Sequence, residues 1–252
     1  MTDSTLWTGP AVALVTLFDD DLAVLPQETA AHAARLVGAG MRAVLVAGST
    51  GEAAALTDDE RIALVAAVKQ ACPDVPVVAG TTGEWAGQAA ERTAQAVKVG
   101  ADAVLVAPPR LGGSLTDYFG RVAEAADGVP VLAYHFPGVA GGAVPVDALP
   151  GLPLAGIKDS SGDAGRFAAE LDWAGGAVYT GSASLTGYAS WLGAAGAILA
   201  VANLVPGLAL AAWDRDPAAQ RELLRTERAY RAVPGGLKAA LAEGTPAGRR
   251  LG

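Results

Sequence analysis

One lysine in this sequence stands where its amine could do chemistry. Lys158 directly follows the apolar run 152–157, in the segment Gly156-Ile157-Lys158-Asp159, so we expect it at the end of a buried strand. Burial disfavours the charged ammonium and lowers the pKa of a lysine from its usual value of about 10.4. A neutral amine can attack a ketone and form a Schiff base. The alternative is a lysine whose stem lies along the strand end and whose ammonium reaches water.

A hydroxyl-bearing turn and a tyrosine are candidates for the same site. The turn Gly48-Ser49-Thr50-Gly51-Glu52 offers backbone N–H groups and two hydroxyls, which together can hold a carboxylate, although an ordinary strand-to-helix loop has a similar composition. Tyr134 could act as a general acid–base near its phenolic oxygen, or be an aromatic residue of the core or rim. Strand alternation places His135 on the opposite face from Tyr134, so we interpret it as a packing residue or supporting hydrogen-bond donor.

The elements that would position these residues alternate along the chain. Short apolar, β-rich segments are expected to be strands, and most are followed by a segment with helical periodicity. The expected strands cover residues 11–18, 42–48, 75–80, 101–107, 130–136, 154–158, 177–181 and 197–202. The expected helices cover 26–39, 57–71, 86–99, 114–126, 164–173, 184–192 and 206–213, and the fifth unit offers only the weak segment 146–149.

This alternation predicts an α/β fold. Strands that are apolar throughout indicate burial on both faces, which is typical of parallel sheets built from βαβ units. Eight such units predict a (β/α)8 TIM barrel, whose usual length is about 250 residues. A doubly wound open sheet is less favoured, because no Gly-x-Gly-x-x-Gly follows the first strand. We assign residues 1–215 to the barrel and 216–252 to a short C-terminal helical extension of the same domain, with helices over 217–232 and 236–242.

Three local signals at helix ends support this division into strands and helices, and the barrel would bring the candidate site residues together at one end. Thr57 begins an acidic capping box, while Gly40 and Gly100 follow helices where a left-handed cap is expected. In a barrel of this kind the chemistry lies at the carboxyl ends of the strands. Lys158 and Tyr134 would stand there on the neighbouring strands six and five.

Charge and cysteine content narrow the function. The net charge is -8 and no basic run is longer than Arg249-Arg250, which argues against a nucleic-acid partner. Cys72 is the single cysteine, so an intrachain disulfide is excluded. His32 and His135 lack metal-ligand spacing, so no metal is expected, and we interpret His32 as structural.

The chain also lacks the patterns of a membrane or secreted protein. The one stretch that approaches 18 uncharged apolar residues, 187–213, is interrupted by Asn203, Pro206 and several glycines, so no membrane span is expected. The first four residues have no basic segment of the kind that begins a signal peptide. The cytoplasm is therefore the expected location.

Four segments together resemble the dihydrodipicolinate synthase / N-acetylneuraminate lyase family of class I, Schiff-base enzymes. They are 48–52, 134–137, 156–159 and 193–206, and the likeness runs from about residue 12 to residue 241. The resemblance implies a covalent imine between Lys158 and the C2 carbonyl of pyruvate or another 2-oxo acid, with no separate cofactor. Tyr134 would move protons, and Thr50 with Ser49 and their turn would bind the carboxylate. We also assign substrate binding to Gly48, Ser160, Gly181, Ile198 and Arg110.

The chain departs from the family pattern in three places. Members that make dihydrodipicolinate carry an arginine where Val139 stands, and valine cannot make a bidentate carboxylate contact. The family's Pro-Tyr-Tyr is Pro108-Pro109-Arg110 here, so a tyrosine that reaches into a neighbouring subunit is absent. Arg110 either binds an acidic part of the substrate or is solvated at the rim. The sequence stops at Gly252, earlier than in relatives, which puts their usual tetramer in doubt; a homo-oligomer, dimer or tetramer, is still expected.

These features favour a class I aldolase of the lyase side of the family. It would reversibly cleave a 2-oxo acid, such as a 2-keto-3-deoxy sugar acid, 4-hydroxy-2-oxoglutarate or a sialic acid, to pyruvate and an aldehyde. A dehydratase or dihydrodipicolinate synthase with the same imine is the first alternative. A non-catalytic protein that binds 2-oxo acids is the second, because fold does not determine function. A metal-dependent aldolase is disfavoured, because the sequence supplies no convincing cluster of histidine and carboxylate ligands.

Overall fold

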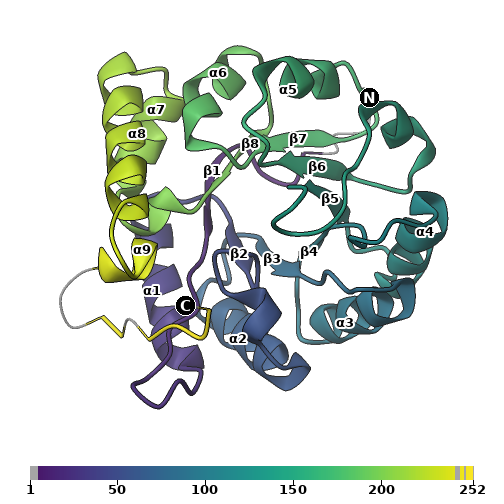
Figure 1. Ribbon diagram of the computed structural model, residues 1–252, viewed down its shortest axis with the longest axis horizontal. Coiled ribbons are helices and arrows are strands. Elements are labelled where there is room, and N and C mark those ends of the chain that lie inside the picture. The colour runs from purple at the N-terminus through teal and green to yellow at the C-terminus, as the bar shows by residue number, and fades with distance from the viewer. Residues whose placement is uncertain (1–4, 242–244, 247, 252) are drawn as a thin grey trace.

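Eight parallel strands close into a barrel in sequence order in the computed structural model, which describes residues 5–241, 245–246 and 248–251 (Figure 1). The predicted (β/α)8 barrel is therefore confirmed. The strands are β1 (Gly9–Ala13), β2 (Val44–Val46), β3 (Val77–Gly80), β4 (Ala103–Val106), β5 (Val131–His135), β6 (Gly156–Asp159), β7 (Ala177–Thr180) and β8 (Gly196–Leu199).

Helices surround the barrel and cover its outer face (Figure 1). The weak fifth unit has no α-helix, only a 3-10 turn that contains Pro150, which agrees with its poor helical signal. The helices are α1 (Pro26–Gly38), α2 (Asp58–Ala71), α3 (Ala86–Lys98), α4 (Leu115–Ala125), α5 (Ala164–Leu171), α6 (Thr186–Trp191), α7 (Pro206–Trp213), α8 (Pro217–Arg231) and α9 (Gly236–Ala239). The 3-10 turns are η1 (Ala53–Ala55), η2 (Val146–Gly151), η3 (Ala183–Leu185) and η4 (Val201–Asn203).

Several predicted boundaries were wrong because burial extends beyond the hydrogen-bonded strands. The first strand was expected over 11–18, but β1 ends at Ala13. Residues 14–18 remain buried outside the barrel strand: the N–H of Leu17 donates to the Thr29 hydroxyl at 3.0 Å, and Phe18 forms an isolated antiparallel bridge with Val24. The eighth strand was expected to reach residue 202, yet a 3-10 turn begins at Val201. The last helix was expected over 236–242; α9 ends at Ala239, and Ala242 lies outside the described residues.

The helix-end signals were predicted correctly. The Thr57 hydroxyl accepts from the N–H of Glu60 at 3.2 Å, and the Glu60 carboxylate accepts from the N–H of Thr57 at 2.8 Å. Gly40 and Gly100 have φ of +106° and +95°, a conformation that side chains disfavour. These caps set where α2 begins and where the chain leaves α1 and α3 for the next strand.

The barrel interior is filled by side chains and closed at its amino end. Trp7, which precedes β1, stacks on Tyr179 with ring centroids 4.2 Å apart, and the Tyr179 hydroxyl donates to the Trp7 carbonyl at 3.3 Å. Above them lies an apolar cluster that includes Leu105, Leu132 and Ile198. Free space in the barrel therefore lies at the carboxyl ends of the strands, as the fold requires.

The segment after the barrel packs onto its helices. Leu223 and Tyr230 of α8 belong to the same buried cluster as Ala33 and Leu36 of α1. The division into a barrel and an extension of one domain stays a prediction. None of the helices in the described residues is long and apolar enough to cross a membrane.

Candidate active site

Lys158 and Tyr134 lie side by side on adjacent strands. The register of β5 and β6 pairs the two residues directly, and the Lys158 Nζ lies 4.6 Å from the centroid of the Tyr134 ring. Lys158 is only 4% exposed, so its ammonium does not reach water as the alternative for a strand-end lysine required. Burial lowers the pKa of Lys158, and the nearby Tyr134 phenol opposes that shift in part. The amine is thus buried and easier to deprotonate than a surface lysine, which is what an attacking nucleophile needs.

A glycine on the next strand makes room for the lysine stem. Gly181 follows β7, and a Cβ at that position would lie 2.8 Å from Cε of Lys158 and would overlap the Ser160 hydroxyl. Any side chain there would displace one of these two groups. The structure therefore places the three predicted residues Gly181, Lys158 and Ser160 in contact with one another.

The turn after β2 presents unused backbone donors. The turn is stabilised by its own backbone hydrogen bonds, because Gly48 O accepts from the N–H of Gly51 at 3.0 Å and from the N–H of Ala53 at 3.2 Å. It is tied to the chain after β1 by the Thr16 hydroxyl, which donates to Gly51 O at 2.7 Å. Among the described residues, nothing accepts a hydrogen bond from the backbone N–H of Ser49 or Thr50. Adjacent free N–H groups of this kind can bind an anion such as a carboxylate.

A cavity of about 210 Å³ joins this turn to the barrel mouth. Four of the predicted residues line it: Gly48, Ser49, Tyr134 and Arg110. The lining does not include the other five, which are Lys158, Thr50, Ser160, Gly181 and Ile198. Lys158 lies behind the ring of Tyr134, with Ser160 and Gly181 against it. Thr50 is half-buried on the turn, and Ile198 belongs to the same buried cluster as Tyr134. The catalytic and binding roles of all these residues stay predictions.

Arg110 lies at the cavity rim and contacts the loop after β5. Its guanidinium donates to the carbonyls of Val139 at 2.6 Å and Gly138 at 3.4 Å. The two positions that depart from the family pattern, 110 and 139, therefore meet at one edge of the cavity. The side chain is exposed and lines the cavity, so it is available to an acidic group at the far end of a substrate.

Two arginines from the outer helices also line the cavity and were missed by the sequence analysis. Arg92 of α3 donates to Thr82 O at 2.6 Å, and Arg61 of α2 donates to Gly80 O at 3.4 Å and to Ala53 O. Both approach the Asp58 carboxylate, at 2.7 and 3.6 Å. Burial, followed by the charge of Arg92, lowers the pKa of Arg61 to about 10. No sequence signal distinguishes these arginines from the solvated charges of an amphipathic helix.

His135 points away from the cavity, as strand alternation predicted. Its Nδ1 accepts a hydrogen bond from the N–H of Val144 at 3.0 Å, so it serves here as an acceptor and not as the expected donor. Burial, with the charge of Arg166, lowers the pKa of His135, and Asp159 opposes the shift. A neutral, buried imidazole that holds a loop fits the expected packing role.

Two buried carboxylates share one arginine behind the Lys158 strand. Arg166 donates from Nε to Asp159 at 2.8 Å and forms a 2.7 Å ion pair with Glu170. Glu170 is fully buried, and desolvation, then repulsion from Asp159, raises its pKa to about 8. The raised pKa favours the protonated form of Glu170 at neutral pH, whereas the contact with Arg166 favours the carboxylate.

This raised pKa predicts a pH dependence of stability. Between the unfolded value of 4.5 and the folded value of about 8, only the folded state holds the Glu170 proton. The free energy of unfolding should therefore fall as pH rises through that window, by up to about 1.4 kcal/mol per pH unit. Urea unfolding of Glu170→Gln should lack this slope, whereas the control Glu222→Gln, which alters an exposed ion pair on α8, should keep it. Parallel pH curves for the wild type and Glu170→Gln would contradict this assignment.

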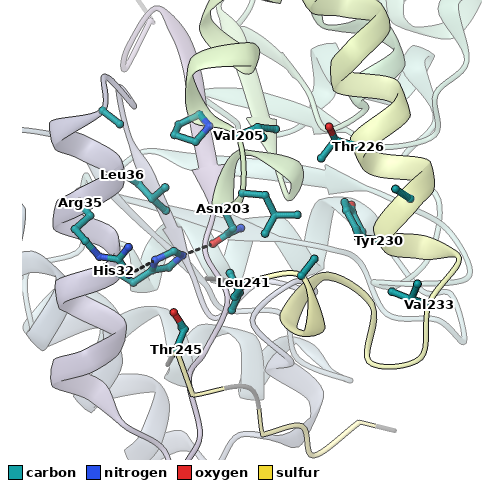
Figure 2. Close-up of a pocket in the computed structure, with 15 residues that line it drawn as sticks. His32, Arg35, Leu36, Asn203, Val205, Thr226, Tyr230, Val233, Leu241 and Thr245 are labelled. Carbon is teal, nitrogen blue, oxygen red and sulfur yellow. Dashed lines mark hydrogen bonds between the residues drawn. The ribbon is translucent and has the colours of Figure 1, made fainter. Parts of the chain in front are cut away.

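A cavity of about 710 Å³ lies elsewhere, between α1 and α8–α9 (Figure 2). His32 spans its wall, with Nε2 3.2 Å from the Asn203 amide oxygen and Nδ1 2.9 Å from the Arg35 guanidinium (Figure 2). Asn203 also accepts from Val15 N and donates to Ala13 O, which joins the ends of β1 and β8. These contacts give His32 the structural role that was expected, and the cavity contains neither Lys158 nor Tyr134.

The described residues contain no group of three or more histidine, cysteine, aspartate or glutamate side chains that could hold a metal ion. Cys72 is a buried free thiol.

Known proteins resemble this chain in sequence and in structure. Residues 7–219 match the sequence model of the dihydrodipicolinate synthetase family. An uncharacterised DapA-like lyase of Halobacterium salinarum is 34% identical over 237 residues, which cover 87% of this chain and 75% of the relative. The dihydrodipicolinate synthase DapA-2 of Bacillus anthracis superimposes with a TM-score of 0.88 and 26% identity, over 97% of this chain and 91% of that one. The KD(P)GA of T. tenax gives a TM-score of 0.83 and 25% identity, over 92% and 85%.

Proposed function

Because the chain belongs to the dihydrodipicolinate synthetase family of pyruvate-dependent carbon–carbon lyases, we propose that it is a class I aldolase. It would reversibly cleave a 2-oxo acid to pyruvate and an aldehyde through an imine on Lys158. One observation carries the proposal: a buried lysine with a lowered pKa lies next to Tyr134, which lines a cavity that also contains Ser49.

In the proposed reaction the neutral Nζ of Lys158 attacks the C2 carbonyl of the 2-oxo acid. The resulting carbinolamine loses water and becomes a protonated imine. The imine draws the electron pair of the C3–C4 bond, so that cleavage gives an enamine and the C4 hydroxyl becomes the aldehyde carbonyl. The enamine then takes a proton at C3, and water attacks C2 to release pyruvate and the free amine.

Two groups would assist these steps. The Tyr134 hydroxyl would deliver a proton for the loss of water and accept the proton of the C4 hydroxyl as the bond breaks. The free N–H groups of Ser49 and Thr50, with the Ser49 hydroxyl, would hold the C1 carboxylate and so orient C2 toward Nζ. Donors that are aimed in advance at a reacting anion are typically worth a few kcal/mol each.

The cavity rim favours a 2-keto-3-deoxy sugar acid with an acidic distal end. Val139 leaves no bidentate contact for a second carboxylate at the position where synthases have arginine, which disfavours dihydrodipicolinate synthesis. Arg110, in the loop after β4, instead supplies a positive charge at the cavity rim. The structural similarity to the T. tenax KD(P)GA supports this choice of substrate class.

Substitution of Arg110 tests that choice. Arg110→Ala should raise KM by about two- to fivefold for a substrate with a distal phosphate or carboxylate, the size expected for one exposed ion pair with a substrate. KM for a neutral sugar acid of the same length should change little. Arg121→Ala, which removes an exposed arginine of α4 that pairs with Asp117, is the matched control. Equal changes in KM for the charged and neutral substrates would contradict the proposal that Arg110 binds the distal anionic group.

The proposed activity is tested by pyruvate release from a panel of substrates. The panel contains 2-keto-3-deoxygluconate with and without a 6-phosphate, 4-hydroxy-2-oxoglutarate and N-acetylneuraminate, and pyruvate is measured with lactate dehydrogenase. Release from at least one substrate by the wild type, and by no substrate with Lys158→Ala, is the expected result. Loss of water without pyruvate would instead show a dehydratase. Imine formation without turnover of any substrate would show a binding protein.

A further inference from the structure

The last described residues of the chain return to the barrel mouth. In Figure 1 the yellow C-terminal segment runs from α9 toward α2, which lies next to the turn after β2. Its backbone packs closely on the chain after β1, because a Cβ at Gly248 would lie 2.7 Å from Asp19 O and 3.1 Å from Phe18 O. Residues 248–251 are named the tail below.

The carboxylate of Glu52 anchors the tail to the turn that carries Ser49. Its Oε2 accepts from the backbone N–H of Arg250 at 2.9 Å and of Leu251 at 2.7 Å, and its Oε1 lies 2.5 Å from Nζ of Lys238. Lys238 in turn donates to Gly248 O at 2.9 Å. Glu52 is 6% exposed and adopts φ of 55°, a left-handed conformation that is costly for a residue with a side chain. The buried ion pair and the two N–H donors therefore hold the end of the turn and the tail as one unit.

The Arg250 side chain provides a second anchor. Its guanidinium forms a fork with the Glu60 carboxylate at 2.7 and 2.8 Å and also donates to Ala55 O and Leu22 O, each at 2.9 Å. The pKa of Glu60 is lowered to about 2, and the hydrogen bond from Arg250 is the largest cause. Bidentate pairs of this kind are specific in geometry as well as favourable in energy.

These anchors place Leu251 in the candidate active site. Leu251 lines the same cavity as Ser49 and Tyr134, and it is 43% exposed, so part of its side chain faces the open space. An apolar side chain at this point displaces water and lowers the local dielectric constant. Hydrogen bonds from the turn to an anion are stronger in such surroundings.

We propose that the tail is part of the active site. Leu251 is a specificity-determining residue that covers the 2-oxo acid end of the cavity, and Glu52 and Arg250 are positioning residues that act through it. This inference rests on the proposed function, because it requires that the cavity bind a 2-oxo acid.

The test measures the pyruvate concentration that gives half-maximal imine trapping by borohydride. Leu251→Ala should raise that concentration by about three- to tenfold, because part of an apolar side chain is lost from the binding site, and should leave the maximal trapped fraction unchanged. Arg250→Ala should have an effect in the same range. The double variant should need no higher pyruvate concentration for half-maximal trapping than the more strongly affected single variant, because both changes remove the same contact.

Two controls separate this role from a general loss of stability. Arg225→Ala removes an arginine–glutamate pair on α8 that is more exposed than the Arg250–Glu60 pair and lies outside the cavity lining, and it should leave the trapping curve unchanged. Thermal unfolding of each variant reports stability independently, and Leu251→Ala is expected to unfold within a few degrees of the wild type. Wild-type half-saturation in the folded Leu251→Ala variant would overturn the inference. Absence of any pyruvate adduct on the wild type would instead refute the proposed function itself.

Discussion

Replacing Lys158 with alanine is expected to lower pyruvate-forming turnover by roughly 10⁴-fold or more, the kind of loss that follows removal of a covalent nucleophile. The physical reason is that no other amine lies beside Tyr134 in the barrel mouth among the described residues. Steady-state release of pyruvate from the best substrate measures the effect. Lys158→Arg is a second variant, because arginine keeps a long cationic side chain but does not form the imine.

The two variants must be compared with a lysine outside the site. Lys69→Ala removes an ion pair with Asp102 on the outer surface and should retain wild-type turnover. Circular dichroism should show that all three variants are folded. Turnover by folded Lys158→Ala within tenfold of the wild type would exclude the lysine as the nucleophile.

Tyr134→Phe is expected to lower kcat by about 10²- to 10⁴-fold, the usual contribution of a positioned general acid–base. The ring and its packing against Lys158 are kept, so KM for the 2-oxo acid should change much less than kcat. The imine should still form, more slowly, because the loss of water from the carbinolamine would lack its proton donor. Steady-state kinetics together with the rate of borohydride trapping measure both effects.

Tyr179→Phe is a closely matched control for this substitution. Tyr179 is also buried on a strand next to Lys158, but its hydroxyl donates to Trp7 O at the closed end of the barrel. Removal of the Tyr179 hydroxyl should lower the free energy of unfolding and leave kcat nearly unchanged. Similar losses of kcat in the two variants would show that the Tyr134 hydroxyl has no special role in proton transfer.

The barrel could be predicted from the sequence because its signals are local. Most strands are short apolar runs followed by a helical pattern, and the capping box at Thr57 and the glycines at positions 40 and 100 mark the ends of helices. Lys158 and Tyr134 could be brought together for the same reason: in a parallel barrel with consecutive strand order, residues at the ends of neighbouring strands are neighbours in space.

The rest of the site depends on contacts between distant segments, which leave no local pattern. In the sequence Arg61 and Arg92 look like ordinary charged residues of amphipathic helices. Their side chains face the cavity because they contact Asp58 and the carbonyls at the strand ends. Leu251 is held at the cavity by Glu52, which is 199 residues away in the chain, and by the contacts of Arg250 with Glu60. The error at the end of β1 has a similar origin, because Leu17 contacts α1 and Phe18 contacts the tail instead of a neighbouring barrel strand.

The most direct test of the central claim is to treat the protein with pyruvate and borohydride and to identify the modified residue by intact-mass and peptide mass spectrometry. We expect one reduced pyruvyl group per chain, located on Lys158 and absent from Lys158→Ala. A folded wild-type protein that acquires no adduct at saturating pyruvate, or acquires it on another lysine, would contradict the proposal that this barrel works through an imine on Lys158.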